Sequence, residues 1–218
     1  MNGKRITIFS GHYGSGKTNV ALTYALSERE KGKRVAIADI DIVNPYFRTK
    51  DSEAELAAAG IQLVSPRYAN TNVDLPALPA ESYRLVQDKS TYGIMDIGGD
   101  DRGAYALGRY VSAIKAENNY RMAFVVNCYR PLTSTVADTV EIMREIETAC
   151  GLEFTCIVNN SNLGSETTPQ TVLDSVDFVE RLSAETGLEI WMHTAEASVA
   201  EQLSLLSVMP MTLQKKIF

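Results

Sequence analysis

Short apolar runs alternate along this chain with longer stretches whose apolar residues recur at helical spacing. The short runs, such as "RVAIADI" and "MAFVVN", are apolar almost throughout, which is typical of strands that are covered on both faces. In "TNVALTYALSEREKG", Val20, Leu22 and Leu26 are among the apolar positions, and Gly32 is a suitable helix end. We expect strands at 5–10, 34–40, 93–98, 122–127, 154–159 and 188–192, and helices at 18–32, 134–150 and 169–187.

This alternation predicts the fold class. Parallel strands joined by crossover helices give an α/β fold, here a three-layer, doubly wound, mostly parallel sheet in a single domain over residues 1–218. The segment 65–81 departs from the pattern, because "SPRYANTNVDLPALPAE" carries three prolines and several turn-forming residues. It is either a functional loop, such as a lid or a partner surface, or an ordinary surface excursion.

Composition and charge narrow the function classes. The chain is 45% hydrophobic and 22% charged, as expected of a globular protein, and its net charge of −6 argues against nucleic-acid binding. Three cysteines without a CxxC pair indicate a reducing compartment. The first residues run directly into a strand candidate without a signal-peptide pattern, and no apolar run reaches the roughly 18 residues of a membrane span. We therefore expect a cytoplasmic protein.

The segment "GHYGSGKT", residues 11–18, lies between the first predicted strand and the first predicted helix. It matches the Walker A pattern, in which glycines let backbone N–H groups turn towards phosphate and the following helix presents its N-terminus to the anion. The lysine can reach the β- and γ-phosphates, and the threonine hydroxyl can bind Mg²⁺. The predicted nucleotide-binding residues are Gly11, His12, Tyr13, Gly14, Ser15, Gly16, Lys17, Thr18 and Asn19.

Aspartates follow two of the predicted strands. Asp39 and Asp41 end the second strand, and Asp96 ends "GIMD" before Gly98 and Gly99. Ligands of open α/β sheets bind at this edge, where carboxylates suit Mg²⁺ and the attacking water. We predict metal roles for Asp39 and Asp96, and a glycine loop that approaches the γ-phosphate at Gly99.

Together, "GHYGSGKT", "DIDIVNPYFR" and "MDIGGDDRG" resemble the MinD/ParA-type branch of P-loop ATPases, within the CobQ/CobB/MinD/ParA superfamily. The resemblance implies Mg-ATP as cofactor and a homodimer in the ATP-bound state. It implies catalytic roles for Lys17 and Asp41, with Asp41 orienting the hydrolytic water, and metal binding by Thr18. It also implies that Asn159, in "VNNSN", reads adenine, for which its amide is suited. An asparagine-rich turn is the alternative.

His12 departs from this branch, whose members typically carry a signature lysine at that position. The lysine reaches across the dimer to the partner's phosphate, and a largely neutral imidazole cannot supply the same charge. Hydrolysis would then use another cation or depend on a partner, or the dimer would differ. Alternatively, His12 occupies a variable position without a role of its own.

The predicted function is an ATPase that acts as a nucleotide-dependent switch on an unidentified protein partner. One alternative is an ATP-dependent small-molecule ligase or kinase, similar to dethiobiotin synthetase and CobB/CobQ, with the 65–81 segment lining an acceptor pocket. A metallochaperone-like GTPase is a third, although "NNSN" lacks the lysine of the guanine-reading Asn-Lys-x-Asp motif. In the tail "VMPMTLQKKIF", Pro210 interrupts any membrane-binding helix, which favours a packed or frayed terminus.

Overall fold

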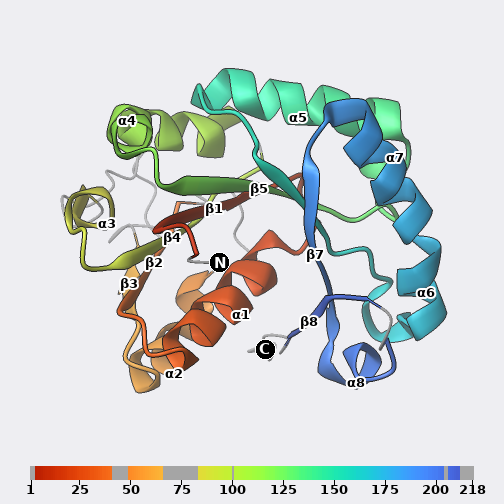
Figure 1. Ribbon diagram of the computed structural model, residues 1–218, viewed down its shortest axis with the longest axis horizontal. Helices are drawn as coiled ribbons and strands as arrows, with labels where there is room; N and C mark the ends of the chain where they lie inside the picture. The colour runs from red at the N-terminus through yellow and green to blue at the C-terminus, as the bar shows by residue number, and fades with distance from the viewer. Residues whose placement is uncertain (1–2, 41–48, 66–82, 100, 204–205, 212–218) are drawn as a thin grey trace, which may run out of the picture.

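The computed structural model of the protein describes residues 3–40, 49–65, 83–99, 101–203 and 206–211. The described strands form one eight-stranded sheet in the order β3-β2-β4-β1-β5-β6-β7-β8, and every neighbouring pair is parallel. This confirms the predicted α/β fold (Figure 1). The strands are β1 (Ile6–Ser10), β2 (Val35–Asp39), β3 (Gln62–Val64), β4 (Tyr92–Asp96), β5 (Tyr120–Val126), β6 (Cys156–Asn159), β7 (Glu189–Glu196) and β8 (Val208–Met211).

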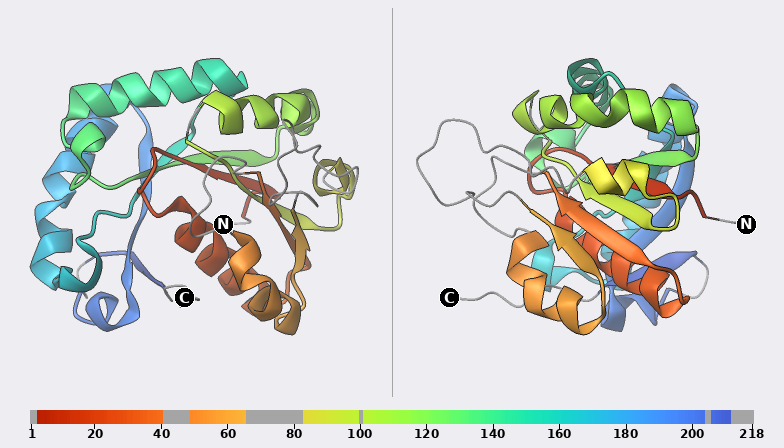
Figure 2. Two further views of the ribbon diagram at one scale, coloured as in Figure 1. Left: turned by 180° about the vertical axis from the view of Figure 1, so that it is seen from behind. Right: turned by 90° about the vertical axis from the view of Figure 1, so that its left-hand side faces the viewer.

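Helices cover both faces of the sheet, as Figure 1 shows and as the views from behind and from the side repeat (Figure 2). Helices α4, α5 and α7 lie over one face, and α1 and α2 lie over the other. The helices are α1 (Lys17–Glu30), α2 (Glu53–Ala58), α3 (Arg84–Gln87), α4 (Asp101–Glu117), α5 (Val136–Cys150), α6 (Pro169–Asp174), α7 (Val176–Thr186) and α8 (Ala197–Ala200), with 3₁₀ turns η1 (Thr49–Ser52), η3 (Pro131–Thr133) and η4 (Gly164–Glu166).

The two-sided cover explains why the strands are apolar throughout. Successive side chains of a strand point to opposite faces, so Ile8 packs in the core beneath α4 and α5, while Phe9 packs beneath α1. Both side chains are fully buried. A strand with two buried faces needs apolar residues at nearly every position, which is the pattern seen in the sequence.

The structure adds elements that the pattern did not predict and divides one that it did. Strands β3 and β8 and helix α4 were not expected, and Pro210 lies in β8, at the edge of the sheet, where the missing N–H is tolerated. The helix predicted at 169–187 ends and restarts at Ser175, whose N–H and hydroxyl both donate to the carbonyl of Val172. The segment 65–81, apart from its first residue, lies outside the described residues.

Candidate functional site

The phosphate loop joins β1 to α1 at the carboxyl end of the sheet. Gly16 precedes the first residue of α1 and has a φ of 81°, and Gly14 has a φ of 78°, a left-handed region that favours glycine. A Cβ at Gly11 would lie 2.2 Å from the Val125 carbonyl oxygen of the neighbouring strand β5. These glycines are required by the backbone path, as the Walker A pattern predicts.

Thr18 and Asp96 meet at this end of the sheet although they are 78 residues apart. The Thr18 hydroxyl donates to Asp96 Oδ2 over 2.7 Å, and the Thr49 hydroxyl donates to the same oxygen over 3.0 Å. All three side chains are buried. A hydroxyl that donates its one proton to a carboxylate keeps its lone pairs for a cation. Thr49, in η1, was not singled out in the sequence and had no motif to mark it.

The residues around this contact fit a magnesium ion. Asp39 ends β2 directly opposite Asp96 in the parallel register, and its side chain is buried. Two carboxylates and a threonine hydroxyl are the hard oxygen donors that Mg²⁺ prefers. No cluster of three or more His, Cys, Asp or Glu side chains that could hold a metal occurs in the described part of the chain. Since Mg²⁺ normally keeps waters and phosphate oxygens as ligands, a small protein contribution suits this ion.

Gly99 brings the loop after β4 against the phosphate loop. A Cβ at Gly99 would lie 1.9 Å from the carbonyl oxygen of Gly11 and 3.0 Å from the Cα of His12. A Cβ at Gly103, in the first turn of α4, would similarly lie 2.6 Å from the Cα of Gly98. Helix α4 begins two residues after Gly99, so a movement of Gly99 would reach the helix directly.

Buried polar atoms without partners gather on the phosphate loop. Among the described residues, the hydroxyls of Ser10 and Ser15 and the Nδ1 atom of His12 are buried and have no hydrogen-bond partner. Burial and, secondarily, the charge of Lys17 lower the pKa of His12, against a smaller opposing effect of Glu145. The lowered pKa favours the neutral imidazole near pH 7, so His12 does not supply a positive charge to the loop. Unsatisfied buried groups of this kind are uncommon and suit a site that binds a polar ligand.

Two side chains from neighbouring loops hold consecutive carbonyls of the phosphate loop. The Arg130 Nε donates to the Gly14 carbonyl over 3.1 Å, and the Asn160 Nδ2 donates to the Ser15 carbonyl over 2.6 Å. Asn160 is oriented in turn by the Thr194 hydroxyl, which donates to its Oδ1 over 2.6 Å. Neither role could be predicted from the sequence, because nothing in either local segment indicates a contact with residues more than a hundred positions away.

The amide of Asn159 is engaged inside the protein. Its Nδ2 contacts the Ser175 hydroxyl at 2.8 Å and His193 Nδ1 at 3.1 Å, and its Oδ1 accepts from the Ser161 N–H at 3.1 Å. The side chain is buried. These contacts hold the turn after β6 in place, so adenine recognition by Asn159 stays a prediction that would require some of them to be exchanged.

The remaining predicted residues are distributed around the loop. Tyr13 is exposed, Asn19 is partly buried in the first turn of α1, and Lys17 is buried at the start of that helix. Asp41, the predicted catalytic residue for water, lies outside the described residues. The structure therefore brings Lys17, Thr18, Asp39 and Asp96 to one end of the sheet together with the glycines at 11, 14, 16 and 99.

A parallel sheet with a glycine-rich loop between its first strand and helix, and with an aspartate of another strand end on the loop's threonine, is the fold of P-loop NTPases. Solved structures agree. Cell division protein FtsY from Thermotoga maritima is similar with a TM-score of 0.62 and 16% identity, over 89% of this chain and 63% of that one. FtsY from Mycoplasma mycoides gives a TM-score of 0.59 and 17% identity, over 88% and 61%.

A third solved structure is the signal recognition particle 54 kDa protein from Aeropyrum pernix K1 in complex with GDP. It matches with a TM-score of 0.55 and 16% identity, over 86% of this chain and 40% of that one. This chain thus spans about three fifths of the FtsY chains it resembles, and at these identities the likeness shows the fold. No protein-family model and no curated protein sequence matches the chain.

Proposed function

We propose that this protein is a Mg-ATP-dependent switch of the MinD/ParA type, a nucleoside-triphosphate hydrolase whose bound nucleotide controls its affinity for a protein partner. The observation that carries the proposal is the 2.7 Å hydrogen bond between the Thr18 hydroxyl and Asp96. It joins the threonine of a Walker A loop to the aspartate at the end of a buried strand, the two protein groups that manage Mg²⁺ in P-loop NTPases.

The roles of the residues follow from their positions. Backbone N–H groups of the phosphate loop and the Lys17 ammonium bind the phosphates, and Thr18, supported by Asp96 and Asp39, holds Mg²⁺. Bound Mg²⁺ neutralises charge on the phosphate oxygens. We assign orientation of the attacking water to Asp41, which follows β2 closely. To Gly99, which packs against Gly11, we assign the coupling between nucleotide binding and helix α4.

A homodimer in the ATP-bound state is part of the proposal. Three of the exposed large apolar side chains of the described residues lie in loops that follow strands at the nucleotide end: Tyr13 after β1, Leu132 after β5 and Leu163 after β6. These three residues share the edge of the sheet at which the strands end, and exposed apolar side chains close together are typical of a protein-binding surface. This supports a face at which a second copy, or a protein partner, binds when nucleotide is present.

A second candidate function differs from the first in the base of the nucleotide, which would be guanine in place of adenine. Two of the similar solved structures, FtsY from Elizabethkingia anophelis and the Aeropyrum protein, were obtained in complex with GDP, which favours a GTP-dependent switch. The sequence "NNSN" lacks the lysine of the guanine-reading motif, which favours ATP. A small-molecule ligase or kinase would use the same phosphate loop and differ by requiring an acceptor.

We place the protein in the cytoplasm. Its three cysteines, Cys128, Cys150 and Cys156, are all free thiols, as expected in a reducing compartment. In the described ranges, no helix combines the length and the apolar character that a bilayer crossing requires.

Thermal unfolding with Mg²⁺ and either ATP, ADP, GTP or GDP tests the proposal. A nucleotide at about 100 times its dissociation constant should stabilise the fold by about 2.7 kcal/mol, a shift of several degrees. A shift with ATP and none with GTP supports the adenine nucleotide, and the reverse supports the GTP-dependent switch. No shift with any nucleotide would overturn nucleotide binding. Phosphate release that requires a small-molecule acceptor would favour the ligase or kinase.

A further inference from the structure

The nucleotide end of the molecule lacks a second cation within the phosphate loop itself, but the structure brings one from another loop. Arg130 follows β5, the strand next to β1, and its guanidinium lies over Gly14. A Cβ at Gly14 would lie 3.5 Å from Arg130 Nε and 3.8 Å from its Cζ. The guanidinium therefore lies within van der Waals contact of the position that a Cβ at residue 14 would take.

The backbone that carries Arg130 is firmly held. Asn127, which is fully buried and directly follows β5, accepts the Tyr129 N–H on its Oδ1. Its carbonyl accepts the Arg130 N–H over 3.1 Å and the Thr133 hydroxyl over 2.7 Å. The Tyr129 hydroxyl donates to the Thr171 carbonyl over 2.7 Å. The backbone of Arg130 therefore needs no ordering when a ligand binds, and the Nε contact with the Gly14 carbonyl directs the side chain to the phosphate loop.

Among the described residues, only the Nε of this side chain has a hydrogen-bond partner. Within the described ranges, the two Nη groups have no hydrogen-bond or ion-pair partner, and the residue is exposed. A guanidinium with its fork of N–H donors open matches the geometry of phosphate oxygens. The hydrogen bond to the Gly14 carbonyl thus places a positive charge with open donors beside the phosphate loop.

We infer that Arg130 is a phosphate-binding residue of the nucleotide site, which supplies within one chain the positive charge that His12 does not carry. The inference rests on the proposed function, because its ligand is the nucleotide bound at residues 11–18. The added charge should favour the triphosphate over the diphosphate, since the triphosphate carries more negative charge near the loop. Arg130 would therefore help the protein distinguish its two nucleotide states.

Three variants separate charge from mere support of the loop. Arg130→Gln removes the charge and keeps an amide donor for the Gly14 carbonyl, whereas Arg130→Lys keeps the charge and loses the planar fork. Arg181→Gln is the matched control, because Arg181 is an exposed guanidinium that pairs with Asp177 on its own helix. Since Arg130 is exposed, all three should unfold at the wild-type temperature without nucleotide.

The experiment is isothermal titration calorimetry with the Mg²⁺ complexes of ATP and ADP, and of GTP and GDP in parallel, at low and high salt. We expect Arg130→Gln to weaken triphosphate binding by about ten- to hundredfold and diphosphate binding less, with a smaller dependence on salt. Arg130→Lys should retain part of the affinity, and Arg181→Gln all of it.

The outcomes that contradict the inference are distinct from those that contradict the proposed function. If the wild type binds nucleotide and Arg130→Gln binds it equally well with the same salt dependence, Arg130 is not a phosphate ligand. If the Gln and Lys variants weaken binding equally and leave the salt dependence unchanged, Arg130 only supports the loop. If the wild type binds no nucleotide, the proposed function fails, and this inference fails with it.

Discussion

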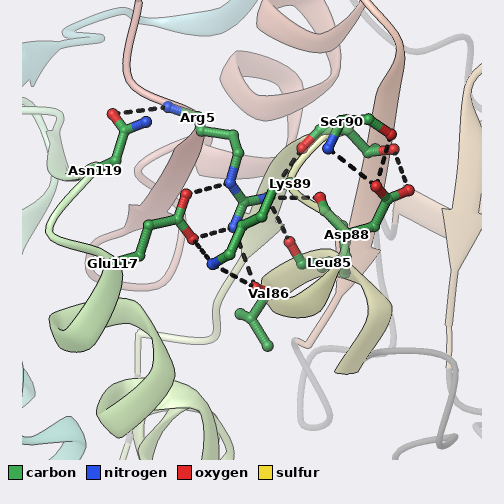
Figure 3. A network of polar contacts seen from close by, with 9 residues as sticks. Arg5, Leu85, Val86, Asp88, Lys89, Ser90, Glu117 and Asn119 are labelled. Atoms are coloured by element: carbon green, nitrogen blue, oxygen red, sulfur yellow. Dashed lines mark hydrogen bonds and ion pairs between the residues drawn. The ribbon is translucent and has the colours of Figure 1, made fainter.

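Arg5 and Lys17 are buried cations on the same stretch of chain, one before β1 and one shortly after it, with side chains 6% and 5% exposed. Arg5 forms ion-paired hydrogen bonds with both carboxylate oxygens of Glu117 and donates to the carbonyls of Leu85, Val86, Asp88 and Thr91 at 2.9–3.2 Å (Figure 3). Lys89 also pairs with Glu117. At the end of the sheet where β1 begins, this network, which we call the Arg5 network, satisfies its charged groups internally and links α3 to α4.

The surroundings of Lys17 are different. Among the described residues, the buried side-chain atoms that lack partners include the hydroxyls of Ser10 and Ser15 and the Nδ1 of His12, whereas no residue of the Arg5 network has one. A buried polar group without a partner costs about 1–3 kcal/mol, so a fold that retains several at one place gains something else from them. A buried charge whose hydrogen bonds are satisfied within the protein therefore indicates a structural role. A buried charge with unsatisfied polar atoms around it indicates a ligand-binding site.

The largest effect on stability is expected from a substitution in the Arg5 network. Arg5→Ala would leave the Glu117 carboxylate without its main partner and several carbonyls without a donor, and should lower the free energy of unfolding by about 3–5 kcal/mol. Urea denaturation measures this. Arg181→Ala, which breaks an exposed pair, should cost about 0–1 kcal/mol. A loss for Arg5→Ala no greater than that of the control would remove the distinction between the two ends.

Lys17→Ala should show the opposite behaviour. The free protein should keep its stability to within about 1 kcal/mol, because this end is built for a ligand, but the stabilisation of about 2.7 kcal/mol by saturating Mg-nucleotide should vanish. Thermal unfolding with and without nucleotide measures both quantities. Lys115→Ala, at an exposed position of α4, is the control and should retain the shift. An undiminished shift in Lys17→Ala would contradict the assignment of the phosphate loop.

Gly99→Ala tests whether the loop after β4 must touch the phosphate loop. Its Cβ would meet backbone at 1.9 Å, so the two loops must separate, and we expect nucleotide affinity to fall by about tenfold, or about 1.4 kcal/mol. Gly108→Ala, in α4, meets nothing nearer than 3.9 Å and should leave affinity unchanged. Calorimetric titration of both variants decides, and equal affinities would mean that the contact has no role in binding.

The smallest expected effect is on the pH dependence of the free energy of unfolding. Burial lowers the pKa of His193, against a smaller opposing effect of Glu180. The unfolded chain therefore takes up the proton first as pH falls below about 6.5, and the free energy of unfolding decreases towards the folded-state pKa, by at most about 1.4 kcal/mol per pH unit. His193→Asn keeps an acceptor for Asn159 without a titrating group. Denaturation at several pH values should show a shallower acid-side decline, and an unchanged decline would exclude His193 as a contributor.

The sequence by itself determined the elements whose signals are local. The apolar runs predicted β1, β2, β4, β5, β6 and much of β7, and the spacing of glycines, lysine and threonine predicted the phosphate loop, because such a loop is defined by the backbone angles of adjacent residues. Asp39 and Asp96 could be placed at the same edge because parallel strands share their carboxyl ends. Helix α4 was not predicted, because its start, "DDRG", combines charged residues with a glycine, which is typical of a loop.

Only the tertiary structure decided which of these residues touch. The contacts from Thr18 to Asp96, from Arg130 to Gly14 and from Asn160 to Ser15 span 78, 116 and 145 residues. They exist because the sheet places β4 and β5 on either side of β1 and β6 next to β5, and no local periodicity encodes that order. The same holds for Asn159, whose internal bonds depend on Ser175 and His193. A sequence motif specifies the chemistry available at a position, and the strand order specifies which partner it meets.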